Sequence, residues 1–290
     1  MVTCSKLTAC PLHLQLNLEG CALPIKKLKG TELDGWGRQL ESLDLSRQGL
    51  GVASAIVIAS LIGVNGSLTV ANLLHNRLDA ESAKMLAEVA KQKGISLCSI
   101  RRDQTSADFS SQNLQPPDAI LLASDLSQAG VTGGLTALDL SFNNLNDEGV
   151  SAVCEAIQSN KETKLASLNI RRTNLRPLGA KSVAATMAVT GSLTSIDLSE
   201  NALTNYGGDM TGIKQLAAAL GVNGSLTKLS LAKNELKEEG TKAVCEALEQ
   251  NTTLKELNIS GRSASNIGGP AGAKHVAKML GVNGSLTKME

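Results

Sequence analysis

The sequence predicts an α/β fold built as a solenoid, in which stacked units each contribute one short strand and one helix. Three observations predict it. The heptapeptide Gly-Val-Asn-Gly-Ser-Leu-Thr occurs three times without change, at 63–69, 221–227 and 281–287. Each copy leads into a phrase of the form L-x-x-L-x-L-x-x-N-x-L, and a helical pattern follows most of these phrases. Self-similarity at a period of roughly 20 to 50 residues is the signature of a stacked-repeat protein.

The phrase combines the periodicity of a strand with that of a helix. Its copies begin at Leu40, Leu68, Leu135, Leu165, Leu193, Leu226 and Leu254, and a truncated copy begins at Leu286. Within one copy, Leu138 and Leu140 alternate with small or polar residues, as they do in a half-buried strand. Further along the same unit, Val150, Val153 and Ile157 recur at helical spacing. Each unit is therefore expected to form a strand, a turn, a helix and a returning loop.

Leucine and asparagine have separate roles in the phrase. One unit cannot bury its apolar side alone, so the leucines are expected to point inward and stack on the neighbouring units. The asparagine at the ninth position is expected to bond backbone groups where the strand ends. It is present as Asn143, Asn201 and Asn234, and it is replaced in other units by Gln48, Gln112, Thr173 and Arg262. Interruptions of the asparagine row are therefore expected.

The regular array is expected to occupy residues 40–290, as about eight units and a truncated ninth. Between 97 and 134 the register is blurred, and two units carry insertions directly after the strand, at 204–212 and 265–272. Residues 1–39 are expected to act as a leader or cap, with Trp36 over the end of the core and a strand at Leu12–Leu18 along the first unit. The last phrase stops at Glu290, so we expect the chain to be a fragment or an incomplete gene product.

Composition excludes some classes of function. There are 28 basic and 27 acidic residues, interspersed along the chain, and the net charge is +1. A nucleic-acid or membrane-surface binder would show a basic stripe or excess, so neither kind of partner is predicted. The longest apolar run, 52–64, is too short to cross a bilayer. The first residues do not read as a signal peptide, which predicts a cytoplasmic location.

No catalytic or metal-binding pattern is evident. The histidines His13, His75 and His275 stand in different units without a recurrent serine or cysteine beside them, so no enzyme is predicted. Cys154 and Cys245 occupy the same helix position and are expected to be small core residues. Cys4, Cys10 and Cys21 with His13 leave zinc open as an alternative, but they lack paired metal-ligand spacing. We predict no metal and no cofactor.

At this point the sequence resembles a known family. The phrase followed by a full helix is similar to the leucine-rich repeat in the long form of ribonuclease inhibitor, which NOD-like receptors and Ran GTPase-activating protein share. The resemblance covers about 39–290. It implies a right-handed horseshoe-shaped solenoid, with a parallel β-sheet on the concave side and α-helices on the convex side. Because these repeats serve many unrelated partners, it implies binding rather than one particular activity.

The candidate site follows from the phrase and the expected curvature. Repeat arrays use concave surfaces for extended binding. The fifth position stays polar or acidic from unit to unit, whereas the eighth position varies, which is where specificity is expected. An aromatic residue next to arginines is the strongest anchor, because such side chains dominate interface hot spots. The predicted partner-binding residues are Arg47, His75, Phe142, Arg171, Arg172, Glu200 and Lys233.

The predicted function is therefore a non-catalytic protein–protein interaction module, a scaffold or regulatory subunit that binds another protein on its concave face. The alternative is a GTPase activator of the Ran type, in which an arginine such as Arg101, Arg102 or Arg176 supplies charge to a phosphoryl transition state. The F-T-G-R loop and acidic tail of that family are not found here. A sensor of the NOD-like kind would need an upstream nucleotide-binding domain, for which the residues before Gln39 are too few.

Overall fold

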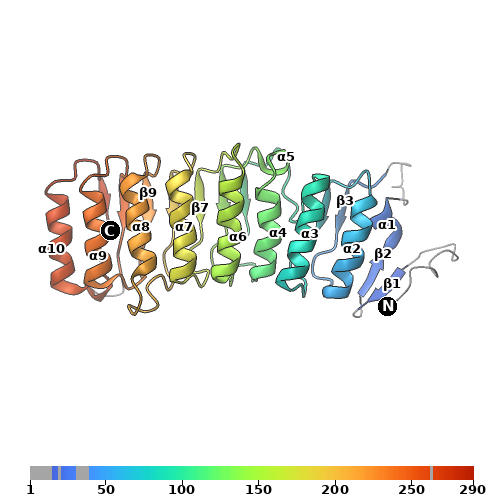
Figure 1. Ribbon diagram of the computed structural model, residues 1–290, viewed down its shortest axis with the longest axis horizontal. Helices are drawn as coiled ribbons and strands as arrows, with labels where there is room; N and C mark the ends of the chain where they lie inside the picture. The colour runs from blue at the N-terminus through green and yellow to red at the C-terminus, as the bar shows by residue number, and fades with distance from the viewer. Residues whose placement is uncertain (1–14, 19–20, 31–38, 262–263) are drawn as a thin grey trace.

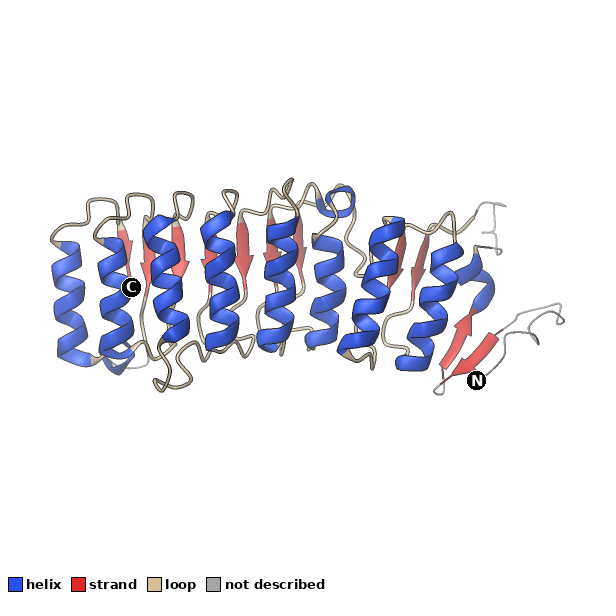
Figure 2. Cartoon of the chain, viewed as in Figure 1, coloured by secondary structure: helices blue, strands red, loops and turns tan. Residues whose placement is uncertain are grey.

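The protein is an elongated stack of strand–helix units, seen in a computed structural model that describes residues 15–18, 21–30, 39–261 and 264–290. Figure 1 shows the units following one another along the long axis in the order of the sequence. Helices line one face of the stack and strands line the other (Figure 2). The alternation of strand and helix that the repeats predict is therefore confirmed.

The strands and helices have the following bounds. The strands of the array are β3 (Ser42–Asp44), β4 (Val70–Asn72), β5 (Ser106–Asp108), β6 (Ala137–Asp139), β7 (Ser167–Asn169), β8 (Ser195–Asp197), β9 (Lys228–Ser230), β10 (Glu256–Asn258) and β11 (Lys288–Met289). The helices behind them are α2 (Val52–Val64), α3 (Ala80–Lys93), α4 (Pro116–Leu126), α5 (Ala129–Thr132), α6 (Asn146–Ser159), α7 (Pro177–Val189), α8 (Thr211–Val222), α9 (Lys237–Leu248) and α10 (Gly269–Leu280). A 3-10 turn, η2 (Ala264–Ile267), precedes α10.

The leucine positions of the phrase form one continuous core between the strands and the helices. In β6 the central Leu138 is buried, while Ala137 and Asp139 on either side are partly exposed. Leu140 and the helix residue Val153 are fully buried as well. Burying a side chain of this kind stabilises a fold by about 1.5–3 kcal/mol, so the repeated leucines supply most of the driving force for stacking.

The concave sheet is parallel, as expected, but it is divided into two pieces. β5 to β11 form one seven-stranded sheet, and β3 pairs with β4 in a separate two-stranded sheet. Between them, Ser96 makes a single parallel bridge to Val70 of β4, and no helix follows it before β5 begins. The blurred register in the sequence therefore marks an extra strand-like segment, 96–98, that has no helix of its own.

Two buried carboxylates of α4 take the place of the missing strand partner. The Asp125 carboxylate accepts hydrogen bonds from the backbone N–H of Leu97 at 2.7 Å and of Cys98 at 3.1 Å, and from the Ser96 hydroxyl at 2.7 Å. Asp118 accepts the backbone N–H of His75 at 2.7 Å. These bonds satisfy N–H groups that would otherwise be buried without partners, which is costly.

A row of asparagines joins the turns at the strand ends. The Asn143 amide donates to the carbonyls of Phe109 and Leu140 at 2.8 and 2.9 Å, and its oxygen accepts the N–H groups of Gln112 and Leu114. Asn76, Asn201 and Asn234 repeat this pattern in their own units.

The row is modified at two of the predicted interruptions. At Thr173 a hydroxyl bonds the Ile170 carbonyl at 2.9 Å in place of an amide. In the last long unit the predicted slot, Arg262, lies outside the described residues. Asn266, which comes from the insertion, there donates to the Ile259 carbonyl and accepts the N–H of Glu235.

A second row of asparagines explains the invariant heptapeptide. The Asn223 amide donates to the Met187 carbonyl at 2.6 Å in the preceding unit, and its oxygen accepts the N–H groups of Ser225 and Leu226. Asn65, Asn160, Asn251 and Asn283 make equivalent bonds at the ends of their helices. The repeated Asn-Gly-Ser is thus a structural joint between units, a role that the sequence analysis missed.

The segment before the array differs from its prediction. β1 (Gln15–Leu18) pairs antiparallel with β2 (Cys21–Pro24), so it forms a hairpin instead of a strand along the first unit. The short helix α1 (Ile25–Lys29) then packs against α2, and its Leu28 is fully buried. The Asn65 amide donates to the Leu28 carbonyl at 3.0 Å. Trp36 and the start of the predicted strand, residues 12–14, lie outside the described residues.

Candidate functional site

The eighth position of the phrase has an unusual backbone conformation that repeats along the stack. Its residues have positive φ angles between 52° and 62° at Arg47, His75, Ser111, Phe142, Arg172, Glu200 and Lys233. For a residue other than glycine, this left-handed conformation costs about 1–2 kcal/mol. Each unit accepts it because the chain must turn away from the sheet there. The side chains of this column therefore lie beside one another in successive units.

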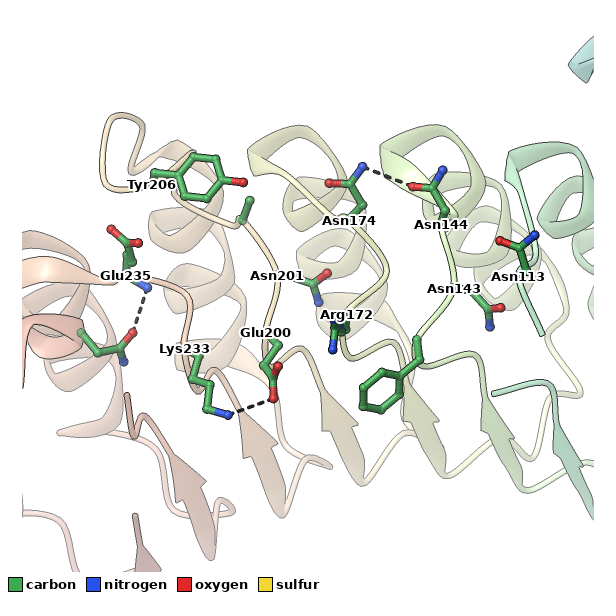
Figure 3. Close-up of a pocket in the computed structure, with 13 residues that line it drawn as sticks. Asn113, Asn143, Asn144, Arg172, Asn174, Glu200, Asn201, Tyr206, Lys233 and Glu235 are labelled. Carbon is green, nitrogen blue, oxygen red and sulfur yellow. Dashed lines mark hydrogen bonds and ion pairs between the residues drawn. The ribbon is translucent and has the colours of Figure 1, made fainter. Parts of the chain in front are cut away.

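The structure divides the predicted site residues between two hollows. Phe142, Arg172, Glu200 and Lys233 line an open hollow of about 1050 Å³ beyond the ends of β6 to β9 (Figure 3). Arg47 and His75 line a smaller hollow of about 360 Å³ beside the division in the sheet. Six of the seven predicted residues thus line two separate hollows, and the seventh, Arg171, contacts Phe142 and Glu200 beside the first. We call the first the central hollow and the second the break hollow.

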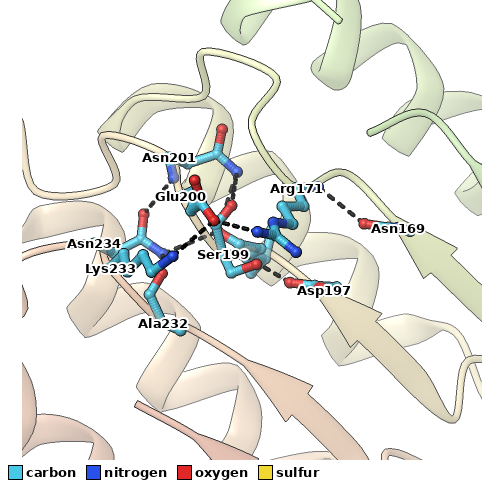
Figure 4. A network of polar contacts seen from close by, with 10 residues as sticks. Asn169, Arg171, Asp197, Ser199, Glu200, Asn201, Ala232, Lys233 and Asn234 are labelled. Atoms are coloured by element: carbon cyan, nitrogen blue, oxygen red, sulfur yellow. Dashed lines mark hydrogen bonds and ion pairs between the residues drawn. The ribbon is translucent and has the colours of Figure 1, made fainter. Parts of the chain in front are cut away.

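A chain of contacts links the large side chains at the central hollow. The guanidinium carbons of Arg171 and Arg172 lie 5.1 and 5.6 Å from the centre of the Phe142 ring. Arg171 also forms an ion pair with Glu200, and the Lys233 ammonium lies 3.0 Å from the same carboxylate (Figure 4). Two cations on one aromatic ring and two on one carboxylate hold this group of residues in a single arrangement.

The charges at the central hollow are not all balanced. Hydrogen bonds from Lys233 and Arg171 hold the pKa of the Glu200 carboxyl below its usual value, so it is ionised at neutral pH. Arg171 and Lys233 are both engaged by that carboxylate. Arg172 is exposed and forms no ion pair with any residue that the structure describes. Its charge is therefore available to a carboxylate on another molecule.

Several residues around the central hollow were not predicted. Tyr206 lies in the insertion at 204–212, is 73% exposed and stands over the rim (Figure 3). Asn113, Asn144 and Asn174 add a row of amides from the tenth position, and the Asn174 amide donates to the Asn144 side-chain oxygen at 3.3 Å. The sequence could have indicated Tyr206, because it is the one tyrosine of the chain and lies in an insertion.

The polar residues at the fifth position have a structural role. Asp139 accepts the backbone N–H of Ser141 at 2.8 Å, and Asp44 and Asp108 accept the equivalent N–H groups of their own turns. The bonds from Ser46 and Ser110 lower the pKa values of Asp44 and Asp108. This column therefore shapes the turn at the end of each strand, and the variable eighth position remains the better candidate for specificity.

Three titratable groups at or near the break hollow, Cys98, Asp118 and Asp125, have pKa values that burial raises. Burial raises the pKa of Asp125 to about 7, against the effect of its three hydrogen bonds, and it also raises the pKa of Asp118. Burial raises the pKa of the Cys98 thiol well above its usual value. A protonated, buried thiol is a poor nucleophile, so Cys98 is not activated for covalent chemistry.

The described parts of the chain show no arrangement typical of metal or thiol chemistry. Within them, no group of three or more histidine, cysteine, aspartate or glutamate residues could hold a metal ion. Burial raises the pKa of Cys154 to about 12 and that of Cys245 to about 11, as befits small core residues. Among the described helices, none combines the length and the apolar character that a bilayer span requires.

Comparison with known proteins agrees with the repeat and the geometry. Residues 135–154 match the family model described as Leucine Rich repeat. This segment contains β6 and most of α6. The fold is a leucine-rich-repeat solenoid. Within that fold, the units have the long form, in which a full helix follows each strand, as in ribonuclease inhibitor.

The individual relatives are similar over part of their length. The chain is 28% identical over 171 residues to NACHT, LRR and PYD domains-containing protein 14 of Mus musculus, which is 59% of this chain and 16% of that protein. It is 28% identical over 216 residues to the ribonuclease inhibitor of Mus musculus, which is 68% of this chain and 47% of that protein. The chain thus spans less than half of either relative.

Among solved structures, the tropomodulin C-terminal domain of Caenorhabditis elegans is similar with a TM-score of 0.41 and 17% identity. The similarity covers 57% of this chain and 93% of that domain.

Proposed function

We propose that this protein is a protein-binding module that holds its partner in the central hollow of the concave face. One observation carries the proposal, namely that exposed aromatic and arginine side chains meet there in one arrangement. Phe142 is 40% exposed although it contacts two guanidinium groups, and Tyr206 lines the same hollow from the insertion at 204–212. Tyrosine and arginine are enriched among the residues that dominate binding energy at protein interfaces.

The ordering of this group supports the proposal. Arg171 is held by both Phe142 and Glu200, and Glu200 is held in turn by Lys233. Side chains that are already ordered lose less conformational entropy when a partner binds, which leaves more of the contact energy for affinity.

We further propose that the partner is a protein rather than a nucleic acid or a membrane, and that the module is a scaffold or regulatory subunit in the cytoplasm. The balanced net charge of +1 supports a protein partner, because the phosphate groups of nucleic acids attract strongly basic surfaces. One relative is named as an inhibitor of ribonuclease, and covering an enzyme is one form of regulatory binding. The partner is expected to place a carboxylate against Arg172.

The test is an affinity purification from native lysate in which wild-type protein is compared with Phe142→Ala and Arg172→Glu. A matched control, Lys242→Glu, changes an exposed charge on the convex helix α9. A purified partner is then titrated against each form. We expect Phe142→Ala to weaken binding about 30-fold, which corresponds to the roughly 2 kcal/mol of a hot-spot residue. The control should bind like the wild type.

Equal capture of the same partners by all forms would refute the proposed site, and the insertion around Tyr206 would be the next surface to vary. The GTPase-activator alternative stays a prediction. It requires the captured partner to be a small GTPase whose rate of GTP hydrolysis rises when this protein is added.

A further inference from the structure

The convex face has a groove where α4 lies deeper than its neighbours. Every residue from Asp118 to Leu126 is buried, although α4 packs between α3 and α6, which both carry exposed charged residues. The sequence explains this. The helix Pro-Pro-Asp-Ala-Ile-Leu-Leu-Ala-Ser-Asp-Leu has no polar stripe on its outer side, as a fully enclosed helix requires. It is also shorter, with 11 residues against 14 in each neighbour.

The groove over α4 has the size and lining that another helix needs. Its volume is about 850 Å³, and Ile120, Ala123 and Ser124 of α4 form its floor. Two turns of an α-helix about 10 Å wide fill roughly the same volume. Ala152 of α6 lines one wall, so a backbone could approach closely. Leu178 of α7, which is 66% exposed, lies at the rim.

The two walls carry different charge. On α6, Glu148 and Glu155 line the groove two helical turns apart, and neither forms an ion pair with a described residue. On α3, Lys84 and Lys91 have the same spacing, but each is paired with a glutamate of its own helix, at 3.0 and 4.0 Å. The pKa of Lys84 is raised mainly by that partner and also by Glu148 across the groove. The unbalanced wall is therefore the acidic one.

We propose that this groove binds an amphipathic helix of a partner protein, with small apolar residues facing α4 and basic residues facing α6. Lysines or arginines seven residues apart on the bound helix would lie opposite Glu148 and Glu155, because residues at that spacing share one helix face. The groove is lined by residues of the helices α3, α4, α6 and α7, whereas the central hollow lies beyond the strand ends, and the two share no lining residue. The two sites can therefore be varied separately.

Two synthetic helical peptides of about 18 residues, or five turns, provide the probes. Both carry the same alanine and leucine face, and they differ only in having lysines or glutamates, seven residues apart, along both flanks of that face. Binding is measured by fluorescence anisotropy with the full chain. We expect the lysine peptide to bind about tenfold or more tightly than the glutamate peptide, since two ion pairs are replaced by two repulsions. Glu148→Lys/Glu155→Lys should reverse that preference.

Two further variants distinguish binding in the groove from nonspecific electrostatic attraction to the protein surface. Glu239→Lys/Glu246→Lys on α9 makes the same change of charge at the same spacing, away from the groove, and should retain the wild-type preference. Ala152→Trp fills the groove without changing charge and should abolish binding while far-UV circular dichroism stays unchanged. The proposal is overturned if the lysine peptide does not bind, if the α9 variant also reverses the preference, or if folded Ala152→Trp binds normally. Equal binding of a proline-containing, non-helical lysine peptide would also overturn it.

Discussion

The row of asparagines at the strand ends leads to the sharpest prediction, which is that Asn143→Ala severely destabilises the array. The residue is 7% exposed, and its side chain makes five hydrogen bonds of 2.8 to 3.2 Å, of which those with Phe109, Gln112 and Leu114 reach the preceding unit. Alanine would leave the N–H of Leu114 and the carbonyl of Leu140 buried without these partners. It would also remove the hydrogen-bond partner of the Gln112 N–H and of the Phe109 carbonyl, which are only partly buried.

The expected magnitude follows from the burial of these groups. An unsatisfied buried donor or acceptor costs about 1–3 kcal/mol, and the partly exposed groups can turn to water. Two fully buried groups therefore predict a loss of about 3–5 kcal/mol in the free energy of unfolding. That is a large part of the roughly 5–15 kcal/mol that stabilises an ordinary domain.

Urea unfolding followed by far-UV circular dichroism measures this loss, and hydrogen exchange of the Leu114 amide reports it locally. Asn144→Ala is the matched control, because that neighbouring asparagine is exposed and its side chain bonds only the side chains of Gln115 and Asn174 among the described residues. It should change stability by no more than about 0.5 kcal/mol. A loss below about 1 kcal/mol for Asn143→Ala would refute the role assigned to the row.

Three other predictions concern single groups. Because burial raises the pKa of Asp125 to about 7 from an ordinary value of 3.8, its contribution to stability is greatest below about pH 4 and is lost as pH rises to about 7. Urea titrations between these pH values should show a shallower decline for Asp125→Asn than for wild type. Ser111→Gly should be more stable than Ser110→Gly by about 1 kcal/mol in thermal unfolding, because only Ser111 has a positive φ. Glu200→Gln should lower stability by less than about 1 kcal/mol, since the pair with Arg171 is partly exposed, and the difference from wild type should shrink in high salt.

The regular part of the fold could be predicted because its signal repeats. Leu138 and Val153 belong to patterns that occur in unit after unit, and each pattern reports a local periodicity of strand or helix. The contact of Phe142 with Arg171 and Arg172 could be predicted for the same reason. Once the repeat aligns the units, residues at the same position of adjacent phrases must be neighbours.

The division of the sheet could not be predicted in this way. It depends on Asp118 and Asp125, which act across the fold from a helix on N–H groups of residues in other units. Asn266 likewise takes the asparagine position from within an insertion, where alignment with the phrase gives no guide. Bonds of this kind come from tertiary contacts, and a single sequence does not encode them as a pattern.

The helix-free segment at 96–98 has a consequence for the kind of object that the concave face can hold. Neighbouring helices pack about 8–10 Å apart, whereas neighbouring strands lie about 4.8 Å apart, and this difference bends a solenoid of paired units. Between α3 and α4 the strand side carries segment 96–98 in addition to β4 and β5, so the strand side is widened there relative to the helix side. The bend is therefore smaller at this point than along the regular units. The face is flatter between the break hollow and the central hollow, and a molecule that touches both must present a flatter side there.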